Sequence, residues 1–235
     1  ESGKSAEAID QYTLAIAEHP DNVALRVNAS TFLRDHGHPN EAMVHLERAV
    51  EIDPNLVEGW YNLGLLLADL QWPMEAMEAF DQVIGIATKK KSHQNLLHYA
   101  VIAKGLQLQK TGQYLEAREF LKNSAAMYPD IAEVCEQNAL FTWIEDPNAL
   151  PSQVLDAHVK WAEKYLPQRL PHSPYRNQLD PERRLKIGYV SGDLRDHAIA
   201  RFFEHVLEFH NRDQFDVICY DNTRKPDAAS DRLRA

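Results

Sequence analysis

Cysteine is scarce in this sequence, with two residues, Cys135 and Cys219, in a chain of 235. They stand far apart, and no group of cysteines and histidines has the spacing of metal ligands. A disulfide framework and a structural zinc site are therefore not expected. Because unpaired thiols are typical of reducing compartments, we expect a cytoplasmic location, and we expect no metal cofactor.

Long apolar runs and an excess of positive charge are also missing. No stretch is long enough to cross a bilayer, and the first residues are polar, so we expect no membrane partner. Acidic residues outnumber basic ones 35 to 25, and the net charge of -10 argues against a nucleic-acid partner. The one basic run, Lys89-Lys90-Lys91, is expected to be a solvated loop.

Glycine-rich nucleotide loops do not occur either. The segment 185–192 contains Gly188 and Gly192 but lacks the third glycine of a dinucleotide-binding turn. A Walker phosphate loop is also absent from the sequence. These absences argue against an NAD-binding domain and against a P-loop nucleotidase.

What the sequence does contain is a 34-residue repeat. This offset relates three sets of residues: Ala8, Ala42 and Ala76; Tyr12, Leu46 and Phe80; Ala15, Ala49 and Val83. Units close on a proline, as at Pro20 and Pro54, and the first half of the pattern is clearest at Trp60, Leu63 and Gly64. The pattern predicts tetratricopeptide repeats over residues 1–129, which are paired helices stacked in a solenoid. Gly64 and the repeat alanines at 42 and 76 should be buried where helices meet.

Two irregularities accompany the repeat. Residues 1–20 match only its second helix, so we expect the native protein to begin further upstream. A fourth unit has its glycine at Gly105, 41 residues after Gly64, and the extra residues fall around 88–94. We expect them to form a loop insertion between units, where solenoids tolerate additional residues.

The pattern changes after residue 129. Residues 130–166 predict two capping helices, the second with Ser152 as its N-cap and with one apolar stripe. That stripe consists of Leu155, Val159, Ala162 and Leu166. Several prolines make residues 167–182 an extended linker.

Residues 183–235 alternate between strand and helix. The segments 185–190 and 215–220 have the composition of strands, and residues 198–210 have that of a helix. This order predicts a parallel pair of strands in a doubly wound α/β domain. Because parallel sheets need cover on both faces, we expect this domain to be cut short here.

The second domain resembles a known family. The run L-K-I-G-Y-V-S-G-D over residues 185–193, followed by His197, is similar to the start of the catalytic region of protein O-linked N-acetylglucosamine transferases. Residues 215–220 and 227–232 are similar to the family's next strand and to its D-x-x-[ST]-x-R segment. Repeats on the N-terminal side complete the arrangement of bacterial members. The resemblance implies a helical tetratricopeptide solenoid followed by the truncated start of a Rossmann-like domain of the GT-B type.

The same resemblance implies an activity. The enzyme would move N-acetylglucosamine from UDP-GlcNAc to Ser or Thr of protein or peptide acceptors held on the concave repeat surface. The nucleotide sugar would be a substrate, no cofactor would be needed, and this fragment alone would be inactive. The chain has Ala198-Ile199 where the family often has a hydroxyl residue. This departure leaves a non-catalytic scaffold for protein–protein interaction open as the alternative, and a different sugar donor or acceptor stays open too.

Three residues carry the predicted site. His197 matches the family's histidine and could take the acceptor's proton, because imidazole titrates near neutral pH. Positioning the acceptor or contacting the donor phosphates would serve as well, and a histidine that only caps its helix is the structural alternative. The resemblance also implies an asparagine ladder for the acceptor at Asn28 and Asn62, which share one repeat position. The alternative there is a solvated or intrahelical asparagine, and the fourth unit has Ala103 at this position.

Overall fold

A computed structural model describes residues 2–166, 180 and 182–234. The chain forms two compact units, Glu1–Leu170 and Pro171–Ala235, and each is described by itself. Most of the predicted linker, residues 167–182, lies outside the described residues. None of the helices in the described part is long and apolar enough to span a membrane.

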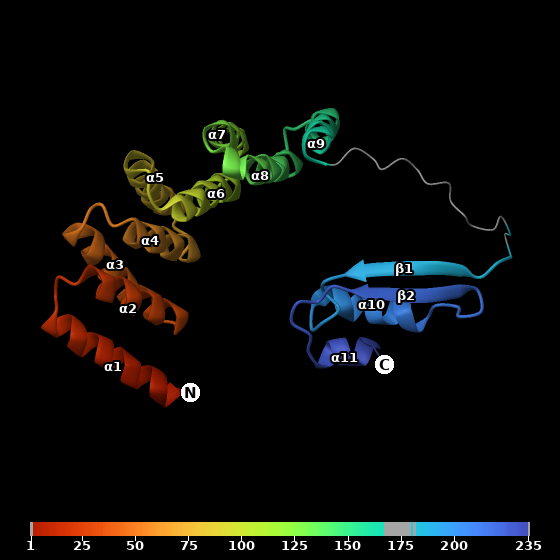
Figure 1. Ribbon diagram of the computed structural model, residues 1–235, viewed down its shortest axis with the longest axis horizontal. Coiled ribbons are helices and arrows are strands. Elements are labelled where there is room, and N and C mark those ends of the chain that lie inside the picture. Colours follow the sequence, from red (N-terminus) through yellow and green to blue (C-terminus); the bar gives the residue numbers. More distant parts are fainter. Residues whose placement is uncertain (1, 167–179, 181, 235) are drawn as a thin grey trace. The chain divides into compact units, whose positions relative to one another are not determined.

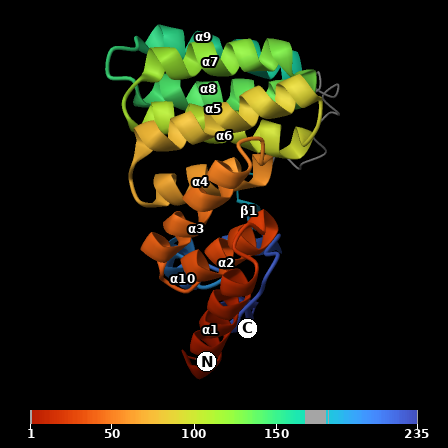
Figure 2. The ribbon, with the colours of Figure 1, turned by 90° about the vertical axis from the view of Figure 1, so that its left-hand side faces the viewer.

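The first unit is a helical tetratricopeptide solenoid, in which the helices stack in chain order (Figure 1; Figure 2). Its elements are α1 (Ser2–Glu18), α2 (Val23–Asp35), α3 (Pro39–Ile52), α4 (Val57–Asp69), α5 (Pro73–Lys90), α6 (Gln94–Lys110), α7 (Tyr114–Met127), the 3-10 turn η1 (Pro129–Ile131), α8 (Ala132–Glu145) and α9 (Pro151–Tyr165). The predicted repeats are confirmed as paired helices with short connections.

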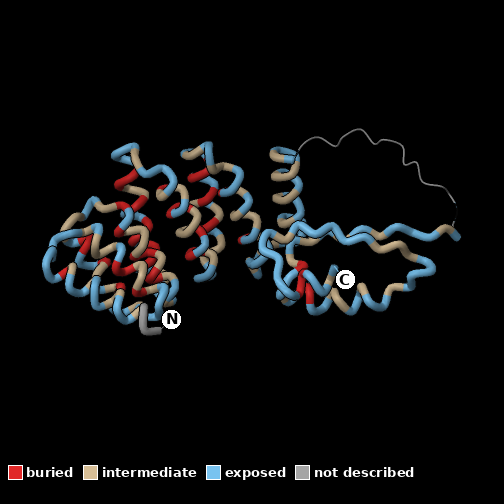
Figure 3. The backbone as a smooth tube through the Cα atoms, turned by 60° about the horizontal axis from the view of Figure 1, so that its bottom comes forward, coloured by how far each residue is buried: buried red, intermediate tan, exposed pale blue. Residues whose placement is uncertain are grey.

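Small residues allow the helices of a pair to approach closely. A Cβ atom built on Gly64 of α4 would lie 2.6 Å from Cε1 of Phe80 on α5. Ala42 and Ala76 are both 0% exposed, so the burial predicted for these three small residues is confirmed. Figure 3 shows the buried residues running through the interior of the helix pairs.

The first helices of the repeats form an inner layer. Contacts join α2 to α4, α4 to α6 and α6 to α8, in addition to the contacts within each repeat. The rings of Tyr61 on α4 and Tyr99 on α6 lie 6.4 Å apart across this layer. In a solenoid the layer whose helices lie closest together lines the concave surface, so α2, α4, α6 and α8 form that surface.

Three details of the first unit differ from the sequence-based predictions. The extra residues after position 88 are not simply a loop, because α5 continues through Lys90 and places its lysines at the helix C-terminus, where cations are favourable. Ser152 is not the N-cap of α9. Leu150 holds that position, since Pro151 is preorganised for the first helical residue.

The apolar stripe of α9 is the third difference. Leu155 is 66% exposed, Val159 44% and Leu166 55%, so this face is not buried within the first unit. The opposite side of α9, with Ala157 and Trp161, faces α7 and α8 around an apolar cavity of about 430 Å³. The amphipathic pattern is present as predicted, but a different face of the helix contacts the repeats.

The second unit contains a parallel β–α–β arrangement. Its elements are β1 (Leu185–Ser191), α10 (Ala198–Glu208), β2 (Phe215–Asp221) and α11 (Ala228–Arg234). The strands pair in parallel from Leu185 opposite Phe215 to Ser191 opposite Asp221, which confirms the predicted parallel pair. Both helices lie on one side of the two strands (Figure 1). The outward face of α10 leaves Phe202 80% exposed.

Candidate functional site

The candidate site lies where the two parallel strands end. Ser191 and Asp221 close β1 and β2 in register, so both strands deliver their following loops to the same edge. In open α/β sheets, ligands bind beyond the carboxyl ends of the strands. The loop of residues 192–197 follows β1, and its first turn is fixed by a hydrogen bond from the Asp193 backbone N–H to Ser191 Oγ at 3.0 Å.

His197 is the N-cap of α10. Its backbone is extended, with φ -144 and ψ 153, and its Nδ1 accepts a hydrogen bond from the backbone N–H of Ile199 at 3.2 Å. A backbone N–H can only donate, so Nδ1 must present its lone pair. The proton of the neutral ring is then on Nε2. The half-buried imidazole can therefore offer a hydrogen-bond donor through Nε2, while its Nδ1 lone pair is already used.

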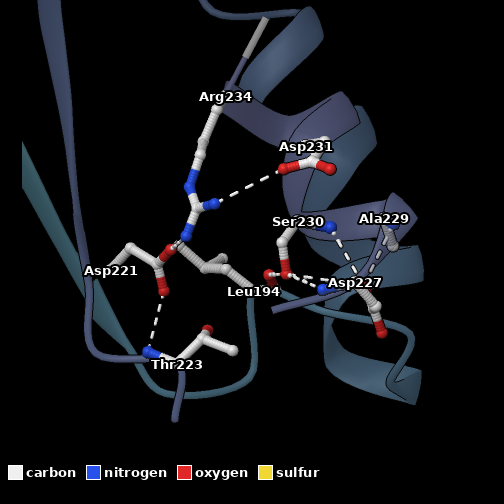
Figure 4. A network of polar contacts seen from close by, with 8 residues as sticks. All are labelled: Leu194, Asp221, Thr223, Asp227, Ala229, Ser230, Asp231 and Arg234. Atoms are coloured by element: carbon white, nitrogen blue, oxygen red, sulfur yellow. Dashed lines mark hydrogen bonds and ion pairs between the residues drawn. The ribbon is translucent and has the colours of Figure 1, made fainter. Parts of the chain in front are cut away.

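The loop that carries His197 is bonded to the start of α11. The carboxylate of Asp227 accepts hydrogen bonds from the backbone N–H of Asp196 at 2.8 Å and from that of Ser230 at 3.1 Å. The Ser230 hydroxyl donates to the carbonyl oxygen of Leu194 at 2.6 Å (Figure 4). The N–H groups of Asp196 and Ser230 hold the pKa of Asp227 below its ordinary value, because they stabilise the ionised carboxylate.

A second carboxylate, that of Asp221, bonds to the other end of α11. Asp221 accepts a hydrogen bond from the Thr223 backbone N–H at 2.8 Å and forms an ion pair with Arg234 (Figure 4). Contacts with Thr223, followed by the Arg234 guanidinium, lower the pKa of Asp221 to about 2. Asp221 is thus an ionised structural partner at neutral pH and is a poor proton acceptor.

Cationic side chains surround the same loop. Arg195 lies 3.7 Å from a carboxylate oxygen of Asp193, and Arg201 lies 3.0 Å from Asp196. Both arginines are exposed, and each is paired with one carboxylate. Among the residues that the structure describes, no group of three or more His, Cys, Asp or Glu side chains could hold a metal ion.

The two predicted acceptor residues lie on the inner helices of the first unit. Asn28 on α2 is exposed, and within the described residues its side chain forms no hydrogen bond. Asn62 on α4 is half-buried, and its Nδ2 donates to the carbonyl oxygen of Glu58 in its own helix at 2.8 Å. One amide is therefore free for a ligand, while the other has its acceptor oxygen free.

The predicted residues thus fall into two groups, Asn28 and Asn62 in the first unit and His197 in the second. Sequence reasoning noted the segment 227–232 but assigned no contact to Ser230 or to Asp221. The spacing D-x-x-S before a helical segment could have indicated the capping role of Asp227. Its bond to a loop 31 residues earlier has no signature in sequence.

Three stretches of the chain match known protein families. Residues 33–71 match the TPR repeat, residues 57–90 the tetratricopeptide repeat, and residues 165–234 glycosyl transferase family 41. The chain joins tetratricopeptide repeats to a family 41 segment.

Curated relatives of this chain include two plant proteins described as probable UDP-N-acetylglucosamine–peptide N-acetylglucosaminyltransferase SPINDLY. The Petunia hybrida protein is 33% identical over 82 residues, which is 35% of this chain and 9% of that protein. The Arabidopsis thaliana protein is 30% identical over 98 residues, 42% of this chain and 11% of that protein. The match therefore spans about a tenth of the length of these relatives.

Among solved structures, a mutant of the Thermobaculum terrenum O-GlcNAc transferase is similar to both parts of the chain. It is 25% identical with a TM-score of 0.56, and the match covers 91% of this chain and 40% of that one. The MamA protein is 21% identical with a TM-score of 0.56 over 72% of this chain and 91% of its own. The likeness to MamA shows the repeat fold alone.

Proposed function

We propose that this protein is a glycosyltransferase that moves N-acetylglucosamine from UDP-GlcNAc to Ser or Thr of a protein acceptor held by the repeats. The observation that carries the proposal is a family 41 segment that follows tetratricopeptide repeats in the same chain, with a likeness to an O-GlcNAc transferase structure that covers 91% of the chain. The parallel β1–α10–β2 unit supports a Rossmann-like start of a GT-B domain.

His197 is the residue we assign to sugar transfer. Its Nδ1 lone pair is occupied by the Ile199 N–H, so Nε2–H is the hydrogen-bond donor that the neutral ring can offer. A donor at this atom suits an oxygen of the nucleotide sugar's phosphates, where negative charge develops as the leaving group departs. The geometry supports this role better than removal of the acceptor's proton, which would need a free lone pair.

The concave surface of α2, α4, α6 and α8 is the proposed place for the acceptor. Asn28 offers a complete amide, and Asn62 offers its carbonyl oxygen, both able to pair with an extended peptide backbone. Ala103 on α6 offers no such group, and Tyr99 on the same helix is 59% exposed. Side-chain amides would thus bind the acceptor backbone only along α2 and α4, the N-terminal half of the concave surface.

The test distinguishes two roles of His197, the N-cap of α10 and a hydrogen-bond donor in sugar transfer. In the full-length protein, His197→Asn keeps a good N-cap acceptor for α10 but removes the Nε2 donor, whereas His197→Ala removes both. With UDP-GlcNAc and a protein acceptor, intact-mass measurement should show hexosamine addition by the wild type. We expect both variants to lose about 100-fold in rate, as on removal of an oxyanion donor. Full activity of His197→Asn would reduce this residue to a cap.

The same assay tests the proposed contacts of Asn28 and Asn62 with the acceptor. Asn28→Ala combined with Asn62→Ala should slow transfer to long protein acceptors and leave the donor KM unchanged, because the amides contact only the acceptor. An unchanged rate on long acceptors would contradict the ladder.

A non-catalytic interaction protein is the second candidate. The absence of a hydroxyl at Ala198-Ile199 favours it. If the wild type bound an acceptor but added no hexosamine to it, this second candidate would replace the first.

A further inference from the structure

The segment 227–232 has the pattern D-x-x-S-x-R, and the three residues that this pattern specifies contact elements outside α11. Asp227 and Ser230 contact the loop after β1, while Arg232 forms an ion pair with Glu204 of α10 at 2.6 Å. The helix α11 has seven residues, too few to be stable alone. These contacts therefore define its position, and through them α11 acts on the loop.

Asp227 joins the loop and the helix through one carboxylate. One oxygen accepts from the backbone N–H of Asp196 at 2.8 Å. The other accepts from the N–H groups of Ala229 and Ser230 at 3.0 and 3.1 Å, which caps the first turn of α11. Each of these N–H groups would otherwise lack a partner at a helix start or in a loop.

Ser230 provides the second bond between the same two segments. Its hydroxyl donates to the Leu194 carbonyl at 2.6 Å and accepts from the Asp227 N–H at 3.2 Å (Figure 4). Ser230 is 1% exposed and Leu194 is 4% exposed. Solvent cannot easily replace this bond, so its loss leaves the Leu194 carbonyl unsatisfied.

These two bonds fix the backbone on the N-terminal side of His197. They hold residues 194 and 196, and residue 196 is the immediate neighbour of the histidine. We propose that Asp227 and Ser230 are positioning residues that set the place of the His197 imidazole during sugar transfer, a role that rests on the function proposed above. Neither side chain reaches the substrate in this role, and both act through the loop backbone.

Arg232 provides the matched control, because it ties the same helix to a different element. Its guanidinium bonds both carboxylate oxygens of Glu204, at 2.6 and 3.1 Å, and among the described residues it forms no hydrogen bond to the loop. Arg232→Gln thus loosens α11 without releasing residues 194–196. If α11 mattered only for stability, Ser230→Ala and Arg232→Gln would have similar effects on catalysis.

The kinetic test uses the full-length protein with Ser230→Ala, Ser230→Thr and Arg232→Gln. We expect Ser230→Ala to lower kcat about 10- to 100-fold with little change in either KM, as for a misplaced catalytic group. Ser230→Thr keeps the hydroxyl and should restore kcat to within about 3-fold, and Arg232→Gln should stay within about 2-fold. An unchanged kcat in Ser230→Ala, or an equal loss in Arg232→Gln, would overturn the proposal.

Hydrogen exchange tests, independently of activity, whether the bonds from Asp227 and Ser230 hold the loop of residues 194–196. In Ser230→Ala, the amides of residues 194–199 should exchange about 10-fold faster or more, whereas those of β1 and β2 should not change. Unchanged exchange in this loop would show that the contacts do not hold it. If the loop loosens as expected but the wild type transfers no sugar, the proposed function fails and the positioning role fails with it, while the anchoring of the loop stands.

Discussion

Gly64 allows a direct measurement of how tightly the repeat helices pack. Replacing it by alanine adds one methyl group facing the ring of Phe80, and its carbon would lie 2.6 Å from Cε1 and 2.8 Å from Cδ1 if nothing moved. Carbon atoms in contact prefer about 3.5–4.0 Å, so the ring would have to move by about 1 Å. Phe80 is 0% exposed and lies within the main core of the solenoid, so the ring cannot move freely.

Two opposing effects determine the magnitude. Overpacking of this kind costs about 1–3 kcal/mol. Alanine in place of glycine within a helix gains about 1 kcal/mol from helix propensity. Gly85 on α5 supplies the matched control, because a Cβ there meets nothing within 4 Å. Gly85→Ala should therefore stabilise the chain, and Gly64→Ala should be less stable than Gly85→Ala by about 1–3 kcal/mol.

The assay is thermal and urea unfolding of the whole chain, followed by far-UV circular dichroism. For a chain of this size, 1 kcal/mol corresponds to about 2–4 °C in Tm, so the two variants should differ by about 2–12 °C. The preceding repeat pairs Ser30 with Leu46 at the matching positions. Phe80→Leu should therefore relieve the strain, and Gly64→Ala should cost less in the Phe80→Leu background.

The reasoning would be refuted if Gly64→Ala and Gly85→Ala shifted the unfolding midpoints by the same amount in the same direction. Such a result would mean that helix propensity alone governs both positions. The ring of Phe80 would then not limit the approach of α4 and α5.

Two further predictions concern titrating groups. Burial, with a smaller contribution from Glu136, raises the pKa of Cys135 to about 11. A thiol reagent at pH 8 should therefore label only Cys219 in the native chain. Mass spectrometry of the Cys219→Ser variant should then find no rapidly labelled cysteine. The hydrogen bond from Arg118 lowers the pKa of Asp146 in the folded state below its ordinary value. This bond therefore stabilises the fold above the ordinary pKa, and the stabilisation is lost as the pH falls through the lowered pKa. In Asp146→Asn, Tm should therefore depend less steeply on pH at acidic pH than in the wild type. The same dependence of Tm on pH in both proteins would contradict this prediction.

The repeat unit was predictable because its period fixes which residues meet. The recurring alanines and Gly64 identify the close contacts between paired helices, and those positions are buried. The continuation of α5 through Lys90 was not predicted, because the periodic pattern marks surplus residues but not their conformation. The first turn of α9 depended on Pro151, whose preference for the first helical position outweighed the capping preference of Ser152.

The candidate site was predictable only in part. The strand–loop–helix pattern located His197 at the end of β1, since strand ends and helix starts have local signatures. The use of its Nδ1 by Ile199 depends on side-chain rotation. The bonds of Asp227 and Ser230 to the loop depend on tertiary contacts across more than thirty residues, which local patterns do not encode.

The solenoid's chain of neighbour contacts has a consequence for how it opens. Its main core draws on α2 to α6, whereas α9 contributes no buried residue and α1, over its described side chains 5–18, has one core residue, Ile16, at 9% exposure. In a one-dimensional stack, the cost of opening is lowest at the ends. We expect α1 and α9 to fray well before the middle unfolds. A pulling force applied to the C-terminal end of the solenoid would therefore peel α9 away before it disturbs the pairs from α2 to α6.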